Sequence, residues 1–331
     1  MTRKATIAGL GKYVPPKVLT NKDLEKMVDT TDEWITSRTG IKERHIVEDD
    51  VATSDIAYEA VNEAMEDANL AAKDLDLILV ATVTPDMMFP STACILQDKL
   101  QAFDAATLDI EAGCSGFVYG LSVAAQFIEN GFYDNALVVG AETLSKITDW
   151  EDRSTCVLFG DGAGAAVLKA TDKGGMLAFD LGADGTGGNS LYMPGGGSRK
   201  PATERTIMDK EHFIKMEGNQ VFKFAVKTMG QSSVDVVKKA GLNPEDVDLF
   251  VPHQANTRII DAAAKRLGIK DSNKVYINLP QYGNTSSASV PIALVEAKEK
   301  GLVNNGDIIV LVAFGAGLTW ASTVIEWNEV E

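Results

Sequence analysis

Two stretches of the chain resemble one another at an offset of 172 residues, close to half of its 331 residues. Residues 68–77 read ANLAAKDLDL and residues 240–249 read AGLNPEDVDL, and each follows an amphipathic helical pattern and leads into an apolar strand. A second pair agrees with the first, because ENGF at residues 129–132 and EKGL at residues 299–302 also precede apolar strands. Two similarities in the same order indicate a chain built from two similar halves.

Each half alternates short apolar runs with amphipathic helical patterns, which predicts an α/β fold. Glycine and turn-forming residues gather between residues 169 and 188, where a connection between the halves is expected. We therefore assign residues 1–174 to an N-terminal half and residues 175–331 to a C-terminal half.

The net charge and the number and spacing of the cysteines argue against several classes of protein. The chain has 31 Lys and Arg against 47 Asp and Glu, and a net charge of −16 argues against nucleic acid as a partner. Three cysteines at irregular spacing and a start without a signal-type apolar stretch predict a reducing, cytoplasmic environment. No apolar run approaches the roughly 18 residues needed to span a bilayer, so no membrane insertion is expected.

Metal and nucleotide cofactors are not predicted. His45, His212 and His253 lie far apart, and none has a metal-ligand spacing with cysteine or carboxylate residues. The glycine clusters at residues 160–164 and 185–188 match neither the dinucleotide-binding nor the P-loop pattern. We interpret both clusters as turns and close backbone contacts.

The strongest candidate for chemistry is Cys114, between a predicted strand at residues 106–110 and a helical pattern from Phe117 to Ile128. Unpaired N–H groups at a helix N-terminus favour an anion, so we expect a stabilised thiolate and a lowered thiol pKa. The alternative, a small buried apolar residue, has about equal weight on this stretch alone.

Two polar residues of the second half are candidates to accompany Cys114. His253 follows the predicted strand 247–251, and ligands bind at the carboxyl ends of strands in open α/β sheets. By the repeat, the junction that contains Asn284 corresponds to the Cys114 junction, so its amide is expected to face the same cleft. A structural histidine and a turn asparagine are the simpler alternatives. The backbone of residues 313–318 could supply N–H groups for an oxyanion.

These segments together resemble the β-ketoacyl-acyl-carrier-protein synthase III family, which initiates type II fatty acid synthesis. The matching motifs are GCSGF, VPHQANTRI, YGNTSSAS, DEWITSRTGIKERH, FGDGAGA and FGAGLTW, and they extend over essentially the whole chain. The resemblance implies a thiolase fold, with two duplicated βαβαβαββ halves in a five-layered α/β/α/β/α arrangement, and a homodimer.

The resemblance also implies a mechanism without a cofactor. Cys114 would attack a short acyl-CoA, and malonyl-acyl-carrier protein would then lose carbon dioxide while His253 and Asn284 stabilise the enolate. The resulting carbanion would attack the acyl group on Cys114 and give a 3-oxoacyl-acyl-carrier protein. The N–H groups of Cys114 and Ala316 would form the oxyanion hole, where similar enzymes usually have glycine in place of Ala316.

A binding site for CoA is implied by the same resemblance. Trp34 and Arg153 would sandwich the adenine, and Arg38, Gly218 and Asn219 would line the rest of the tunnel. Trp34 and Arg38 are four residues apart, so they can share one helical face. On these residues alone, an ordinary surface helix with a half-buried tryptophan is the simpler interpretation.

Contacts with the acyl chain and the carrier protein complete the implied site. Phe314 and Phe89 would line the acyl pocket, Phe89 from the neighbouring subunit, and Gln254 and Arg258 would belong to the docking surface for an acidic carrier protein. The alternatives are a related condensing enzyme with another acceptor, a cysteine acyl-CoA hydrolase, and an inactive homologue that binds carrier protein.

Overall fold

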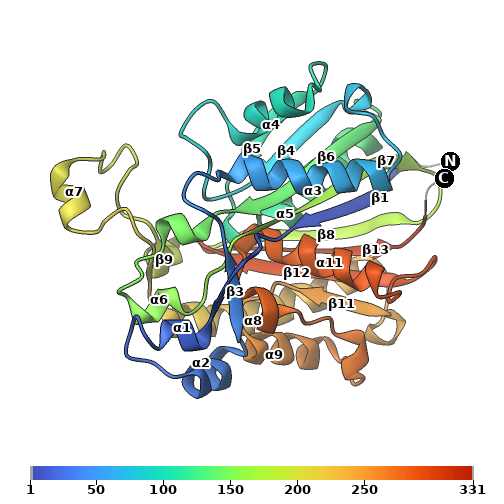
Figure 1. Cartoon of the computed structure of the whole chain (residues 1–331). Helices are drawn as coiled ribbons and strands as arrows, with labels where there is room; N and C mark the ends of the chain where they lie inside the picture. Colours follow the sequence, from blue (N-terminus) through green and yellow to red (C-terminus); the bar gives the residue numbers. More distant parts are fainter. Residues whose placement is uncertain (1–2, 330–331) are drawn as a thin grey trace.

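The computed structural model describes residues 3–329, and its first half is built on a five-stranded sheet (Figure 1). The strand order is β1 (Lys4–Tyr13), β7 (Gly162–Thr171), β6 (Asn135–Glu142), β4 (Leu77–Ala81) and β5 (Ala106–Ile110). β4 is parallel to both β5 and β6, whereas β7 is antiparallel to β1 and β6. The carboxyl ends of the parallel strands β4, β5 and β6 lie at the same end of the sheet, and Cys114 follows β5 at that end.

The second half has a four-stranded sheet of similar topology. Its order is β11 (Leu249–Pro252), β12 (Ile308–Gly315), β13 (Thr319–Glu326) and β8 (Gly175–Ala183). β11 and β12 are parallel, and the other neighbours are antiparallel. His253 follows β11 directly, at the end of the sheet that corresponds to the end carrying Cys114 in the first half.

The long helices are distributed among three layers and joined by short elements. The long helices are α3 (Thr53–Asp67), α4 (Thr92–Leu100), α5 (Gly116–Glu129), α8 (Gly218–Lys239), α9 (Thr257–Leu267) and α11 (Ser289–Glu299). Shorter helices are α1 (Asn21–Leu24), α2 (Asp32–Thr39), α6 (Arg153–Cys156), α7 (Glu204–Met208) and α10 (Leu279–Tyr282). Two small sheets pair β2 (Lys17–Thr20) with β3 (Glu43–Ile46) and β9 (Leu191–Tyr192) with β10 (Lys215–Met216).

Three hydrophobic cores separate the layers. The central core contains α5 and α11 between the two sheets, with Phe117 and Leu294 fully buried. A second core packs α3 and α4 on the outer face of the first sheet, and a third packs α8 and α9 on the outer face of the second. Figure 1 shows these five layers stacked from α3 to α9. The predicted five-layered thiolase-type arrangement is therefore confirmed.

Close contact between α3 and β1 depends on glycine. A Cβ added at Gly9 would lie 2.3 Å from the carbonyl oxygen of Ala64, and one at Gly11 would lie 2.2 Å from that of Ala60. Small residues on both elements thus let a helix backbone approach the strand directly, which a larger side chain would prevent.

The two halves differ at one strand, and Gln254 explains the difference. The counterpart of β5 is reduced to an isolated bridge between Val275 and Phe250. The side-chain oxygen of Gln254 accepts hydrogen bonds from the N–H groups of Asn278 and Leu279, at 3.0 and 3.1 Å. A buried side chain therefore satisfies backbone groups that a longer strand would pair in a ladder. The first half has the predicted βαβαβαββ order, and the second has it with this strand shortened.

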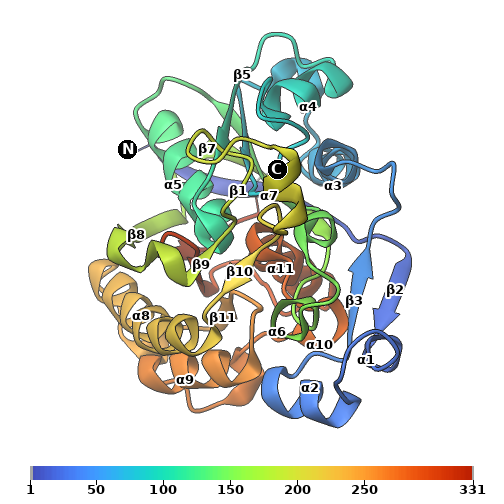
Figure 2. The same ribbon diagram turned by 90° about the vertical axis from the view of Figure 1, so that its left-hand side faces the viewer.

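Two segments that lie outside the main sheets cover the end where the parallel strands have their carboxyl ends. One carries α1 and α2, and the other is the excursion from β8 to α8, which includes α7. Figure 2 shows α7 and the β9–β10 ribbon in front of the layers, with α8 and α9 side by side below them. Among residues 3–329, no helix is long and apolar enough to cross a membrane.

Candidate active site

Cys114 lies in the 3-10 helix η2 (Gly113–Ser115), between β5 and α5, and only 7% of its surface is exposed. The loop after β12 packs directly against it. A Cβ at Gly113 would lie 2.6 Å from the backbone nitrogen of Ala316, and one at Gly315 would lie 2.4 Å from that of Cys114. Gly113 also has a φ of +54°, a conformation that favours glycine. The N–H groups of Cys114 and Ala316 are thus held beside the same site.

The Thr319 hydroxyl links the two loops. Its oxygen is 2.8 Å from the carbonyl oxygen of Ala112 and 3.0 Å from that of Ala316, and it accepts a hydrogen bond from Ser115 at 2.8 Å. Ala316 itself is not among the residues with positive φ. Alanine therefore introduces no backbone strain at this position.

The predicted lowering of the Cys114 pKa is wrong. Burial raises the pKa of the thiol to about 12, the charge of Glu142 adds to the increase, and a hydrogen bond from Ser286 opposes it. Burial removes most of the hydration of the thiolate, and this effect outweighs the hydrogen bonds that favour the charged form. The Cys114 thiol therefore needs a group that accepts its proton.

His253 is buried beside Ser289 and Phe314. Its Nδ1 lies 2.6 Å from the Ser289 hydroxyl, and the N–H of Gln254 donates to that same oxygen at 3.4 Å. The Ser289 proton is therefore free to be donated to Nδ1, which leaves the ring proton on Nε2. Nε2 is buried and has no hydrogen-bond partner in the described part of the chain. Burial lowers the pKa of His253 to about 3, so the ring is neutral and presents one N–H donor.

Asn284 is oriented by its own loop. Its side-chain oxygen accepts a hydrogen bond from the N–H of Ser286 at 2.8 Å. Its backbone pairs with both Leu158 and Gly160, which anchors the loop to the first half of the chain. Because the amide oxygen is occupied, the NH₂ group is the end that can donate to a ligand.

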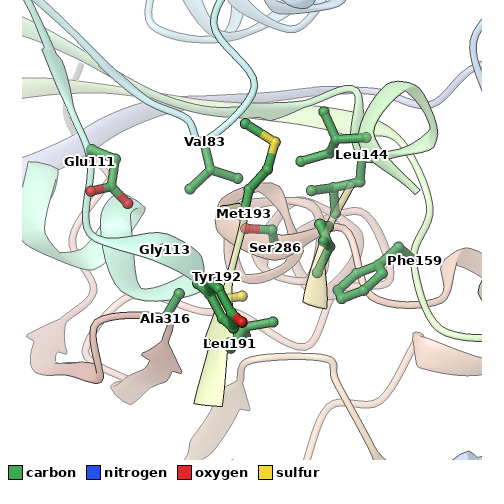
Figure 3. A pocket seen from close by; sticks show the side chains of 13 residues that line it. Val83, Glu111, Gly113, Leu144, Phe159, Leu191, Tyr192, Met193, Ser286 and Ala316 are labelled. Carbon is green, nitrogen blue, oxygen red and sulfur yellow. The ribbon is translucent and has the colours of Figure 1, made fainter. Parts of the chain in front are cut away.

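Two cavities meet at Cys114. The first has a volume of about 330 Å³ and is mainly apolar; it is lined by Val83, Glu111, Gly113, Cys114, Leu144, Ile147, Phe159, Leu191, Tyr192, Met193, Ile214, Ser286 and Ala316 (Figure 3). The second, of about 390 Å³, is more polar and includes Cys114, His253 and Asn284 in its lining. A nucleophile at the junction can thus receive an acyl group through one cavity and hold its apolar chain in the other.

Most of the residues predicted to bind CoA line the second cavity. Trp34, Arg38, Gly218 and Asn219 all contribute to its wall. The guanidinium groups of Arg38 and Arg153 lie 5.7 and 4.9 Å from the centroid of the Trp34 ring. α2 begins at a Thr31 cap and ends at Gly40 in the left-handed conformation, so this cationic and aromatic cluster is built on a well-defined helix.

Four other predicted positions have different outcomes. Gln254 is 1% exposed and hydrogen-bonded to backbone on both ends of its amide, so its assignment to a docking surface is wrong. Phe314 lines the second cavity beside His253, with the rings 5.4 Å apart, and does not line the apolar one. Phe89 is 84% exposed and lines neither cavity within its own chain. Arg258 is exposed on α9 and lines the polar cavity.

Sequence reasoning missed three polar residues in this site: Glu142, Ser286 and Ser289. Glu142 is fully buried at the end of β6, and both oxygens of its carboxyl accept hydrogen bonds. The argument that singled out His253, a polar residue directly after an apolar strand, applies equally to Glu142. Ser286 and Ser289 carry no such local signal, because only the packing of η7 (Ser286–Ala288) and α11 against the first half brings them to the site.

The described part of the chain contains no group of three or more His, Cys, Asp and Glu residues that could hold a metal ion. The site instead combines a thiol, two neutral N–H donors and two backbone N–H groups around the junction of the cavities. Such a set suits covalent transfer of an acyl group followed by stabilisation of a second, oxygen-centred negative charge.

Comparisons with known proteins agree with this chemistry. Residues 108–185 match the family model "3-Oxoacyl-[acyl-carrier-protein (ACP)] synthase III", and residues 237–327 match its C-terminal counterpart. A protein from Caldanaerobacter subterraneus named Beta-ketoacyl-[acyl-carrier-protein] synthase III is 64% identical over 98% of both chains, and one of the same name from Desulfitobacterium hafniense is 58% identical over 98% of both. The crystal structure of 3-oxoacyl-[acyl-carrier-protein] synthase III from Aquifex aeolicus has a TM-score of 0.90 at 47% identity and covers 98% of this chain and 100% of that one.

Fold and family together define a thiolase-fold condensing enzyme of the acyltransferase type. More particularly, the chain belongs to the β-ketoacyl-acyl-carrier-protein synthase III family, whose members carry out the initiating condensation of fatty acid synthesis.

Proposed function

We propose that this protein condenses a short acyl-CoA primer with malonyl-acyl-carrier protein, using Cys114, His253 and Asn284. The observation that carries the proposal is the convergence of these three residues where an apolar cavity meets a polar tunnel. Both substrates carry the activated groups that the reaction needs, so no cofactor is required.

In the first half-reaction, the Cys114 sulfur attacks the thioester carbon of the primer and CoA leaves. The carbonyl oxygen becomes negatively charged in the tetrahedral intermediate, and the N–H groups of Cys114 and Ala316 lie together to receive it. The acyl chain then occupies the apolar cavity, whose volume of about 330 Å³ limits the length of the primer.

In the second half-reaction, malonyl-acyl-carrier protein enters through the tunnel and loses carbon dioxide. The thioester oxygen gains negative charge as the enolate forms, and the donors from His253 Nε2 and Asn284 stabilise it. The terminal carbon of the enolate attacks the acyl carbonyl, and the Cys114 thiolate is released. A neutral His253 suits this role, because it can donate a hydrogen bond without losing a proton to the enolate.

CoA would enter along α2 and α8. The stacked cluster of Trp34 and Arg153 offers a flat cationic surface to the adenine, and Arg38 supplies a further positive charge for the phosphates. Gly218 and Asn219 begin α8, where the helix N-terminus also favours an anionic group.

The carrier protein would dock on the face formed by α8 and α9. Arg258, Lys265 and Arg266 are exposed on α9, and Lys223 and Lys227 are exposed on α8 beside it (Figure 2). A local basic surface on a chain of net charge −16 favours encounter with an acidic partner at this one face.

The active form would be a homodimer, formed along the edge strand β5. Apolar side chains around that edge are exposed in the single chain: Met87, Met88, Phe89, Phe103 and Leu108. A second copy would cover them and bring its own Phe89 to the acyl cavity. Because CoA thioesters are substrates of central metabolism, we place the enzyme in the cytoplasm.

The test is to incubate the protein with acetyl-CoA and malonyl-carrier protein and to measure carbon dioxide, CoA and the carrier-protein mass. Carbon dioxide and CoA should appear in equal amounts together with a 3-oxoacyl-carrier protein. A Cys114→Ala variant should form no 3-oxoacyl-carrier protein. Release of CoA alone would instead identify a hydrolase, and condensation only with a different acceptor would overturn the assignment of the extender.

A further inference from the structure

The carboxyl group of Glu142 is buried between the two halves of the chain. Its Oε2 accepts hydrogen bonds from the N–H of Val83 at 3.1 Å and from the hydroxyl of Thr84 at 2.7 Å. Its Oε1 lies 2.9 Å from the hydroxyl oxygens of both Ser286 and Ser287. No basic side chain within residues 3–329 forms an ion pair with it. A buried carboxylate without a cation is costly, and burial raises the pKa of Glu142.

The two serines make different contacts. Ser287 has one hydroxyl proton, and the carbonyl oxygen of Ala81, 2.8 Å away, can only accept a hydrogen bond. The single Ser287 proton is therefore shared between two acceptors, the Ala81 carbonyl oxygen and Glu142 Oε1. Ser286 donates to Glu142 Oε1 and lines the same cavity as Cys114, where its hydroxyl counteracts part of the rise in the thiol pKa, and a thiol can donate or accept a hydrogen bond.

Ser286 thus connects the nucleophile to the carboxyl group. It lies at the start of η7 with a φ of +49°. Its hydroxyl lines the apolar cavity together with Cys114, as Figure 3 shows for Ser286. A chain of three groups, thiol, hydroxyl and carboxyl, therefore runs from the cavity into the protein interior.

The other titratable groups near the cavity are not suited to accept the Cys114 proton. His253 Nδ1 accepts the Ser289 proton and Nε2 carries its own, and with a pKa of about 3 the ring is a poor base at neutral pH. Glu111 lines the far part of the apolar cavity and is exposed to water. Hydroxyl groups of Thr82 and Thr84 supply the remaining side-chain contacts of Glu142 on the side away from Cys114.

From this geometry we propose that Glu142 accepts the Cys114 proton through the Ser286 hydroxyl when the thiol attacks its substrate. This inference deepens the proposed function, on which its role in turnover rests. Glu142 touches no substrate and acts through Ser286, so it is a positioning and proton-holding residue, whereas Ser286 contacts the reacting sulfur.

The step balances as follows. The Cys114 S–H proton moves to Ser286 Oγ, the Ser286 hydroxyl proton moves to Glu142 Oε1, and the sulfur electron pair forms the bond to the acyl carbon. The bond between that carbon and the CoA sulfur breaks, and CoA leaves as a thiolate that is protonated by water in the tunnel. When condensation later releases the Cys114 thiolate, the proton returns from Glu142 by the same route.

Glu142→Gln is the sharpest test, because glutamine has the shape and the hydrogen bonds of the protonated acid but cannot accept a proton. The assay is alkylation of Cys114 by iodoacetamide between pH 5 and 10, followed by peptide mass, together with single-turnover acylation by acetyl-CoA. In the wild type both rates should rise with pH as Glu142 ionises and then level off above its raised pKa. In Glu142→Gln both should fall about a hundredfold at pH 7 and rise about tenfold per pH unit without levelling.

Ser286→Ala and Ser287→Ala form a matched pair of controls. Both remove a hydroxyl from the same carboxyl oxygen, but only Ser286 connects to Cys114, so only Ser286→Ala should reproduce the loss and the steeper pH profile. This pair decides the question even if Glu142→Gln does not fold. Equal effects of the two variants, or a Glu142→Gln profile like that of the wild type, would overturn the relay. Alkylation needs no acyl-CoA, so the alkylation rates test the relay independently of the proposed function. A wild type that is alkylated by iodoacetamide but never acylated by acetyl-CoA would contradict the proposed function only.

Discussion

Removal of the His253 ring should separate the two half-reactions. The imidazole Nε2 is buried, has no hydrogen-bond partner among residues 3–329 and carries the proton, so it is available to donate to a substrate oxygen. Because burial lowers the pKa of His253 to about 3, the ring is not expected to take the Cys114 proton. His253→Ala should therefore slow decarboxylation and condensation and leave acylation of Cys114 largely intact.

The size of the effect follows from the loss of one donor in a site without bulk water. Such a loss typically costs about 2.7–4 kcal/mol of transition-state stabilisation, or roughly a hundred- to a thousandfold in rate. Asn284→Ala removes the second donor and should have an effect of similar size. Acylation should stay within about tenfold of the wild type in both variants, which corresponds to less than about 1.4 kcal/mol of barrier.

The assay measures the half-reactions separately. Intact mass after rapid mixing with acetyl-CoA reports acylation, and release of labelled carbon dioxide from malonyl-carrier protein reports decarboxylation. If acylation collapsed together with condensation in His253→Ala but not in Asn284→Ala, the histidine would act on the nucleophile and the division of roles would be wrong. Thermal unfolding of both variants checks that the buried site is intact.

Three further predictions concern the nucleophile, the docking face and the packing around Cys114. Treatment with acyl-CoA should label Cys114 and neither Cys94 nor Cys156, since only Cys114 lines the cavities; a peptide label on another cysteine would contradict the site. Arg258→Glu should lower kcat/KM for malonyl-carrier protein about tenfold or more and slow acylation by acyl-CoA much less, because an exposed charge acts on encounter; equal loss in both half-reactions would refute a docking role. Gly113→Ala should destabilise the fold by about 1–3 kcal/mol in a denaturant titration, because a φ of +54° and a contact of 2.6 Å disfavour a Cβ; an unchanged midpoint would refute the packing argument.

Features that depend on order along the chain could be predicted from the sequence. The repeat indicated two similar α/β halves, and the five layers confirm the fold that the motifs implied. Cys114 was found because it lies at a helix N-terminus after a strand, and His253 because a polar residue directly after an apolar strand lies where ligands bind. The division of the chain at residues 174 and 175 stays a prediction, as do the roles of the docking and CoA-binding residues.

Only the tertiary structure decided which polar groups are buried and what they touch. A motif placed Gln254 on the docking surface, but its amide is enclosed between β11 and the segment that pairs with it. The sequence correctly located Cys114 at a helix N-terminus, yet the sign of its pKa shift was wrong, because the helix dipole is a local property and desolvation depends on every neighbouring segment. Glu142 and Ser286 are 144 residues apart in the chain and meet only where the two halves pack. Local patterns thus determined where each strand ends, and the packing of the two halves decided the protonation chemistry at those ends.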